Sequence, residues 1–348
     1  FKKLNMKKKS LSVKKKIHRT LLTHLKNPLI NKIYEEFNNF VKFNLNKSNF
    51  SVAVSGGSDS LALVYFSKCY SISNNINIKY YHVDHKLRKE STSEAKKLKF
   101  LLKKFDINCK ILNWRGKKPK SNIQAAARTK RYSLIYNECL KDKVDFIIQK
   151  LDEIYPDVSP PLKHNDTYTL LIAVLLSANT TDKSVNRVTP RLFKKANTPK
   201  KMSQLDYETI YNIIKPCGLG PAKAKAILEL SKILVQKYNS RIPSSFEDLE
   251  SFPGVGHKTA SVVMSQAFDI PAFPVDTHVH RLMYRWGLSS GRNVQDTEKQ
   301  AKRLFPKNKW NKLHLQIVFY GREYCPAKNF NVNNCPITSV VGRRSLFK

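Results

Sequence analysis

The chain has 348 residues, of which 41% are hydrophobic, and its 63 Lys and Arg against 26 Asp and Glu give a formal net charge of +37. This length is enough for two ordinary domains, and the longest apolar run, LLIAVLLSA at 170–178, is too short to span a bilayer. The sequence thus excludes a helical membrane protein and predicts a soluble chain with no membrane partner. The basic excess favours a polyanionic partner such as nucleic acid, with a lysine-rich genome as the competing explanation.

The first 48 residues are strongly basic. Their start, FKKLNMKKKSLSVKKKIHRTLL, lacks the apolar core and cleavage site of a secretory signal. We expect residues 1–48 to form a basic, solvated arm or helix. The six cysteines form no dense framework of the secreted type, which favours a reducing cytoplasm and free thiols.

Residues 49–141 alternate short apolar runs with helical segments. Strands are expected at FSVAV (50–54), INIKYYHVDH (76–85) and INCKILNW (107–114), and helices at 59–71, 91–105 and 123–140. Three strand-helix units predict an α/β domain with a parallel sheet and right-handed crossovers. From 142 to 348 only helical periodicity broken by Pro and Gly remains, which predicts a second domain that is all-α.

The stretch SGGSDS at 55–60 lies between the first predicted strand and the first predicted helix. Two glycines let the backbone approach a phosphate, and the free N–H groups at a helix start favour an anion. The candidate phosphate-binding residues are Ser55, Gly56, Gly57, Ser58, Asp59 and Ser60. Such turns also occur without a ligand, so the motif alone leaves both interpretations open.

Two later segments, VDHKLRKESTSEA (83–95) and NIQAAARTKRY (122–132), stand at characteristic distances from SGGSDS. Together they resemble the amino-terminal part of the PP-loop ATP-pyrophosphatase domain, a Rossmann-like fold, of tRNA-isoleucine lysidine synthase. The resemblance covers roughly residues 10–140 and implies that the glycine loop binds the pyrophosphate of ATP. It also implies further site positions at Asp84, His85, Arg88, Asn122, Gln124 and Arg128.

The resemblance stops in the middle of that domain. No GHHxDDxxEN-type segment follows Tyr132, and the later tRNA-binding parts of the synthase are missing. We therefore expect a truncated sheet with the far side of FSVAV exposed, no lysidine synthase activity, and no tRNA partner. Residual ATP binding by the remaining loop is left open.

The second half contains two similar passages, PCGLGPAKAKAI (216–227) and FPGVGHKTASVV (252–263). Each predicts a helix, a tight turn of the form Gly-hydrophobic-Gly and a new helix, which is the helix-hairpin-helix pattern. Glycines at such a turn let backbone N–H groups face a DNA phosphate. The predicted contacts are at Gly218, Gly220, Gly254, Val255 and Gly256, although glycine-capped helices also occur without DNA.

Three segments around the second passage strengthen this interpretation: LLIAVLLSANTTDKSVN, VDTHVHR and HLQIVFYGREYC. In this order and spacing they resemble endonuclease III, a helix-hairpin-helix DNA glycosylase and apurinic-site lyase, over roughly residues 144–336. The resemblance implies catalytic roles for Lys258 and Asp276. It implies DNA contacts at Asn179, where many relatives have the longer Gln, and at Thr180, His257, His278 and Arg281.

The implied chemistry is base excision. A carboxylate at Asp276 would stabilise positive charge on the sugar carbon as a damaged base leaves. The amine of Lys258 would attack that carbon and form a Schiff base that promotes strand cleavage by β-elimination. Oxidised pyrimidines and abasic sites in duplex DNA are the expected substrates, with the target nucleotide flipped out of the helix.

The carboxyl end departs from this family. Relatives usually have four cysteines spaced CxxxxxxCxxCxxxxxC for a four-iron, four-sulfur cluster. Here Cys325 and Cys335 are present, and Thr338 stands where a third ligand belongs. Two thiolates without a nearby His also make no zinc site. We expect no cluster, no metal and no other cofactor for the glycosylase.

Three functions therefore stand against one another: a glycosylase-lyase carried by residues 142–348, a lysidine synthase carried by 49–141, and a DNA-binding module without activity. We favour the first, acting as a monomer, because its domain is nearly whole and keeps both catalytic positions. The motifs do not indicate which lesions are preferred, since the shape of the pocket decides that.

Overall fold

The computed structural model describes residues 2–45 and 50–347 of the chain. The chain folds into two compact units, residues 1–143 and residues 144–348. The first unit contains the sheet. The elements described after residue 154 are all helices. The predicted fold classes, an α/β part followed by an all-α part, are therefore confirmed.

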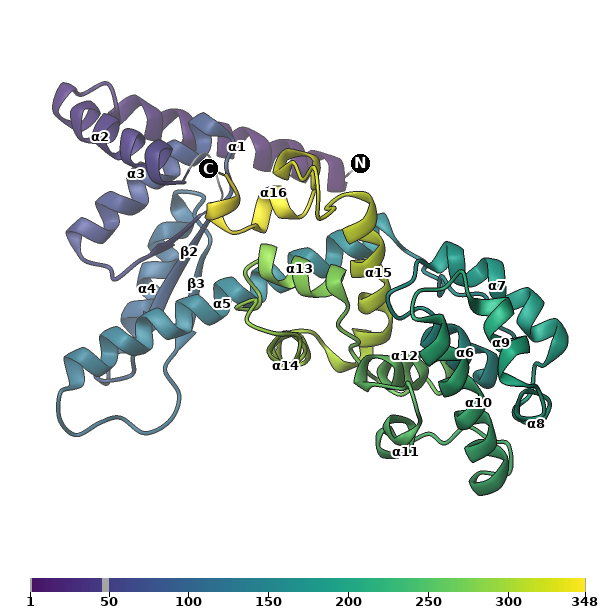
Figure 1. Cartoon of the computed structure of the whole chain (residues 1–348). Helices are drawn as coiled ribbons and strands as arrows, with labels where there is room; N and C mark the ends of the chain where they lie inside the picture. Colours follow the sequence, from purple (N-terminus) through teal and green to yellow (C-terminus); the bar gives the residue numbers. More distant parts are fainter. Residues whose placement is uncertain (1, 46–49, 348) are drawn as a thin grey trace. The chain divides into compact units, whose positions relative to one another are not determined.

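The first unit alternates helices and strands (Figure 1). Its elements are α1 (Lys2–His24), α2 (Pro28–Leu45), β1 (Phe50–Ala53), α3 (Ser58–Asn74), β2 (Ile78–Asp84), α4 (Ser91–Lys104), β3 (Cys109–Asn113) and the first part of α5 (Ile123–Ile154). The strands pair in parallel in the order β1-β2-β3, with Phe50 opposite Ile78 and Tyr80 opposite Cys109. β1 is thus an edge strand, as expected from the missing strands.

Side chains alternate between the two faces of this sheet. From β2, Ile78 and Tyr80 join a core with residues of α1 to α4, whereas Tyr81 and Val83 pack with Leu134 and its neighbours on α5. Helices therefore cover both faces, as in other parallel sheets.

The amino-terminal helices are part of this core and not a solvated arm. Leu21 of α1 and Tyr34 and Val41 of α2 are buried in the same cluster as Val52 of β1. Amphipathic spacing in PLINKIYEEFNNFVKFNL gives α2 one face that packs against α3. Of the basic, solvated arm or helix expected at 1–48, the helices form over Lys2–His24 and Pro28–Leu45, but they pack into the core and are not solvated on all sides.

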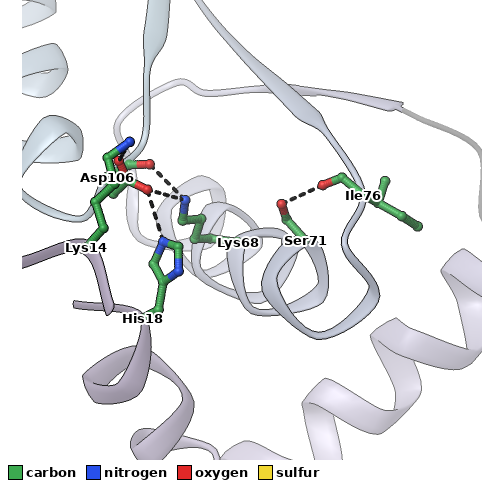
Figure 2. Close-up of polar contacts among 6 residues, drawn as sticks. All are labelled: Lys14, His18, Lys68, Ser71, Ile76 and Asp106. Atoms are coloured by element: carbon green, nitrogen blue, oxygen red, sulfur yellow. Dashed lines mark hydrogen bonds and ion pairs between the residues drawn. The ribbon is translucent and has the colours of Figure 1, made fainter. Parts of the chain in front are cut away.

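Asp106 anchors α1 to the turn between α4 and β3. Its carboxylate accepts from His18 Nε2 at 3.0 Å and pairs with Lys68 Nζ at 3.2 Å and Lys14 Nζ at 3.3 Å (Figure 2). Burial alone would raise the pKa of Asp106, but the hydrogen bond from His18 and the two ammonium groups hold it below its ordinary value. One carboxylate thereby joins three segments of the unit.

Helix α5 is longer than predicted. We expected it to end near Leu140 and a new helix to begin, but it runs unbroken to Ile154. No Pro or Gly interrupts residues 123–154, and Pro156 follows its end. Asp142 on this helix accepts a hydrogen bond from the Tyr81 hydroxyl and pairs with Lys79 Nζ at 2.8 Å, which ties it to β2.

Over its described residues, 144–347, the second unit consists of helices and loops (Figure 1). Its α-helices after α5 are α6 (Thr167–Leu176), α7 (Asp182–Lys195), α8 (Pro199–Ser203), α9 (Tyr207–Ile214), α10 (Gly220–Lys237), α11 (Phe246–Ser251), α12 (His257–Ala267), α13 (Thr277–Arg285), α14 (Val294–Leu304), α15 (Trp310–Glu323) and α16 (Thr338–Val341). Short 3₁₀ turns lie at Lys307–Lys309, Val332–Asn334 and Arg344–Phe347.

Helix α6 is the centre of the core of this unit. Every residue from Tyr168 to Leu176 is buried, so this helix is apolar all round and is covered on each side by other helices. Asp166 and Thr169 form a capping box at its start. No helix within the described ranges is long and apolar enough to cross a membrane.

Replacing Asp106 by Asn should loosen α1 in the first unit. A carboxylate whose folded pKa is depressed contributes stability above its unfolded pKa of about 3.9 and loses it as pH falls through the folded pKa. At pH 7 the full contribution is present, and we expect a loss of about 1 kcal/mol for this partly exposed cluster. Amides of residues 14–24 should exchange faster with deuterium in Asp106→Asn, with no change in Glu36→Gln on the exposed side of α2. Equal exchange in both variants would contradict this role.

Candidate functional site

Two helical hairpins form as predicted in the second unit, one from α9 and α10 and one from α11 and α12. In the second, Gly254 has φ +75°, and a Cβ built there would lie 2.9 Å from Ala226 Cβ and 3.3 Å from Leu175 Cδ1. Only glycine fits this close approach without a shift. Gly256 is the N-cap of α12, and nothing lies within 4 Å of the position of its missing Cβ.

Lys258 and Asp276 are brought together at the starts of two helices. Lys258 is the second residue of α12. Asp276 is the N-cap of α13, where its Oδ1 accepts from Val279 N at 2.8 Å. Both side chains line one cavity of about 70 Å³, which we call the catalytic cavity. Asp276 is thus a helix cap and a cavity residue at once.

A histidine that the motifs did not indicate lies beside this pair. His314 of α15 lines the catalytic cavity and is 5% exposed. Burial lowers the pKa of His314 to about 4; the carboxylate of Asp276 opposes the shift, and Lys258 and Arg322 add to it. The imidazole is therefore neutral at physiological pH.

A second, larger hollow of about 500 Å³ collects three of the predicted DNA contacts, Asn179, Thr180 and His278. We call it the outer hollow. Asp182 and Arg322 line both this hollow and the catalytic cavity, and Arg322 Nη1 lies 2.6 Å from Asp182 Oδ2. Burial lowers the pKa of His278, and Arg322 is among the cations that contribute to the shift.

The loop that carries Asn179 is held by a buried lysine. Lys223 of α10 is 5% exposed, and its Nζ donates to Leu176 O at 2.8 Å, Ala178 O at 2.6 Å and Thr180 Oγ1 at 2.9 Å. Burial lowers the pKa of Lys223. Nothing in the surrounding sequence, AKAKAI, distinguishes Lys223 from an exposed lysine.

His257 is clamped between two carboxylates. Its Nδ1 lies 2.7 Å from Glu250 Oε1, and its Nε2 lies 3.1 Å from Glu298 Oε2. Burial alone would lower the pKa of His257, but the hydrogen bonds to Glu250 and Glu298 outweigh it, and the pKa is raised above its ordinary value. Both ring nitrogens are engaged within the unit, so the DNA contact predicted for this side chain has no support in the geometry.

Three other predicted DNA contacts have internal roles. The Val255 side chain is buried in the core, and Gly220 is buried against Tyr211. Arg281 Nη2 donates to Gly321 O at 2.9 Å and Cys325 O at 3.2 Å. Val255 and Gly220 shape the hairpins, and the Arg281 side chain holds the carboxyl end. Of Val255 and Gly220, only the backbone is left to meet a phosphate.

Leu219 of the first hairpin is a candidate DNA contact that the motifs did not predict. It lies in the turn with φ +61°, and its side chain is 59% exposed. The preceding Gly218 packs closely on Asn179, since a Cβ built there would be 3.1 Å from Asn179 O. An exposed leucine in a left-handed turn is the signal that would have found it.

The carboxyl-terminal loop is filled by protein groups. Cys325, Cys335 and Thr338 are all buried, and Trp286 Nε1 donates to Thr338 Oγ1 at 3.0 Å. Arg285 Nη1 donates to Cys325 O at 3.1 Å and Pro326 O at 2.8 Å. Among residues 2–45 and 50–347, no three His, Cys, Asp or Glu side chains gather as metal ligands would.

The glycine loop of the first unit forms a separate site. Gly56 has φ +96°, and its N–H donates to Ser60 Oγ at 3.0 Å. A cavity of about 620 Å³ is lined there by Ser55, Gly56, Asp84, His85, Arg88 and Arg131, among others. Asn122, Gln124 and Arg128 do not line it, nor do residues 57–60. Part of the predicted nucleotide site is thus brought together.

Comparison with known proteins identifies both units. Residues 172–307 match the HhH-GPD superfamily of base excision DNA repair proteins, and residues 25–153 match the PP-loop domain. A helix-hairpin-helix unit with a lysine and an aspartate in one cavity therefore belongs to the class of base-excision DNA glycosylases.

The relatives within that class are endonucleases III. The chain is 38% identical over 199 residues to endonuclease III of Bacillus subtilis, covering 57% of this chain and 91% of that protein, and 37% identical over 191 residues to that of Escherichia coli, covering 55% and 90%. A solved structure of a trapped endonuclease III–DNA covalent intermediate matches with 37% identity and a TM-score of 0.56, covering 57% of this chain and 94% of the other. The chain belongs to the endonuclease III family.

The clamp on His257 should make stability depend on pH. A histidine whose folded pKa is raised contributes stability that is present below its unfolded pKa of about 6.5 and is lost as pH rises through the folded pKa. The difference in unfolding free energy between the wild type and His257→Gln should therefore shrink between pH 6 and pH 9, as measured by urea unfolding. His24→Gln, at an exposed position of α1, is the control and should show no such trend. A difference that stays constant with pH would contradict the clamp.

Proposed function

We propose that Lys258 and Asp276 are the catalytic pair of a DNA glycosylase and apurinic-site lyase that acts on oxidised pyrimidines and abasic sites in duplex DNA. The observation that carries the proposal is that these two side chains, from the starts of different helices, line one cavity. A nucleophile and a carboxylate at one point are what base removal requires.

In the first step the bond between the sugar C1′ and the damaged base breaks. The base leaves with the electron pair and takes up a proton, while positive charge develops on C1′ and its ring oxygen. The carboxylate of Asp276 stabilises that charge, and its fixed position as the N-cap of α13 means that little reorganisation is needed. The amine of Lys258 then forms a bond to C1′ and gives up a proton, which balances the proton taken up by the leaving base.

In the second step the sugar ring opens and the Lys258 adduct becomes a Schiff base. The iminium makes the C2′ proton more acidic. A proton acceptor removes that proton, the C3′–O bond breaks, and the 3′ phosphate leaves. Water then releases the sugar fragment and regenerates the lysine amine. The strand is cleaved at the abasic site with no cofactor.

DNA is proposed to lie over the two hairpins and the outer hollow. Gly256 is the N-cap of α12 with nothing within 4 Å of the position of its missing Cβ, and the free N–H groups at such a helix start favour an anion such as a DNA phosphate. Gly218, which precedes the exposed Leu219, packs against the backbone of Asn179. Asn179 and Leu219 would together fill the space that a flipped nucleotide leaves. Leu219 supplies the apolar bulk that the short Asn179 lacks.

The two units are proposed to be the two domains, with the boundary close to the predicted 141/142. The first unit keeps a cavity large enough for a nucleotide, but its sheet ends at the β1 edge and the acidic segment of the synthase family is missing. We propose ATP binding at most, no ligase activity, and a monomeric, cytoplasmic glycosylase.

No four-cysteine cluster fits the carboxyl-terminal loop. Thr338 stands where a third ligand belongs, and its hydroxyl is taken by Trp286. The Cys335 thiol donates a hydrogen bond to Tyr324 O at 2.6 Å, so it too has a partner within the protein. Hydrogen bonds from Arg285 and packing against Phe330 hold the loop instead. We propose that this enzyme works without an iron–sulfur cluster.

Borohydride should trap the wild type covalently on a duplex with an abasic site, and Lys258→Ala should form no adduct. Asp276→Asn should trap on the order of 10²-fold more slowly, because Asn caps a helix as well as Asp but carries no charge. Gel electrophoresis of the trapped complex measures both. Lys299→Ala, an exposed lysine of α14, should trap like the wild type.

The alternatives give different results in the same assays. An adduct that survives in Lys258→Ala would contradict the choice of nucleophile. DNA binding without any adduct in the wild type would favour a binding module. ATP-dependent lysidine formation on isoleucine tRNA would favour the synthase.

Iron analysis of the purified protein should give far less than one iron per chain, even after growth in iron-rich medium and anaerobic purification. The reason is that this loop has two cysteines and a threonine where the four ligands of a cluster would stand. An iron content near four per chain, with the brown colour of a cluster, would contradict the proposal.

A further inference from the structure

The ion pair between Asp182 and Arg322 separates the two hollows of the second unit. Asp182 is the first residue of α7, and Arg322 lies in the last turn of α15. Both line the catalytic cavity and the outer hollow, and their side chains meet at 2.6 Å. The pair therefore lies where the outer hollow adjoins the cavity that Lys258 lines.

Size and charge both indicate that the arrangement is closed. The catalytic cavity, at about 70 Å³, is well below the roughly 300–1,000 Å³ of ordinary ligand pockets, so a flipped nucleotide does not fit unless the walls move. The guanidinium of Arg322 acts on both sides, since it contributes to the lowered pKa of His278 in the outer hollow and of His314 in the cavity.

The ion pair is suited to opening. The side chains are 38% and 21% exposed, but Asp182 Oδ2 itself is buried and makes no hydrogen bond with the described residues, so its contact with Arg322 is an ion pair without hydrogen-bond geometry. Ion pairs between partly exposed side chains are weak. A guanidinium binds a phosphate by two parallel hydrogen bonds as readily as it binds a carboxylate. A phosphodiester in the outer hollow can therefore take the place of Asp182.

We propose that the Asp182–Arg322 ion pair is a gate to the catalytic cavity, opened when a backbone phosphate next to the flipped nucleotide replaces Asp182 as the partner of Arg322. The inference rests on the proposed function, because it assigns the outer hollow to the DNA strand that carries the lesion. Arg322 is then a substrate-binding residue, and Asp182 is a positioning residue that acts through it. Undamaged duplex, with no flipped nucleotide, leaves the gate closed.

The test is equilibrium binding to a duplex with a tetrahydrofuran abasic analogue and to the same duplex without it, which needs no catalysis. Asp182→Asn removes the competitor for Arg322 and should tighten binding to the abasic duplex about three- to tenfold, with little change for undamaged DNA. Arg322→Gln should weaken binding to the abasic duplex about tenfold and lower the slope of log K against log salt by about 1, because one phosphate contact is lost. Arg322→Lys keeps the charge and should keep the slope.

Two controls and a double variant separate the gate from general effects of charge. Glu153→Gln and Lys150→Gln remove the same charges from an ion pair of 2.5 Å on α5, and neither should change the ratio of abasic to undamaged binding. The double variant Asp182→Asn/Arg322→Gln should match Arg322→Gln alone, since Asp182 acts only through Arg322.

Equal weakening in Asp182→Asn and Arg322→Gln, or tightening in Asp182→Asn that is the same for both duplexes, would overturn the gate. Borohydride trapping of the wild type is read separately. A wild type that shows the predicted binding pattern but never traps contradicts the catalytic proposal and leaves the gate intact.

Discussion

The buried ammonium of Lys223 is the contact on which the site depends. The last carbonyl groups of a helix have no partners within it, and the helix dipole makes that end negative. At the end of α6, Lys223 meets Leu176 O and Ala178 O together with the Thr180 hydroxyl. Taking a lysine out of water is costly unless such acceptors compensate. The contact joins the first hairpin to the loop of Asn179 and fixes the position of that loop, which we propose meets DNA.

The same helix also positions the catalytic hairpin. Leu175, near the end of α6, lies against Gly254, whose left-handed turn starts the path to Gly256 and Lys258. Opposite Lys258, Asp276 holds the start of α13 by a hydrogen bond to Val279 N. The cap is therefore compatible with the catalytic role that we propose for Asp276, because a carboxylate has several acceptor sites and the cap uses one of them.

Local patterns predicted more of the fold than of the site. Alternation of apolar runs was enough for the three parallel strands, because side chains on both faces of this sheet are buried. The end predicted for α5 near residue 140 is wrong, because residues 123–154 contain no Pro or Gly that would break the helix. Lys258 and Asp276 were found through motifs. Lys223, His314 and the Asp182–Arg322 pair were not, since their roles depend on burial and on contacts between residues far apart in the chain.

Both units contain a glycine turn directly before a helix. Gly56 and Gly254 both have positive φ and both precede a helix start. In either place the turn supplies N–H groups for a phosphate and no reactive group. In the first unit the neighbouring cavity lacks the acidic segment of its family, so binding is all that the remaining residues favour. In the second, a lysine follows the turn and faces an aspartate across a small cavity. A glycine turn of this kind can bind an anion in either unit, but only the second unit adds the lysine and the aspartate to which we assign the chemistry.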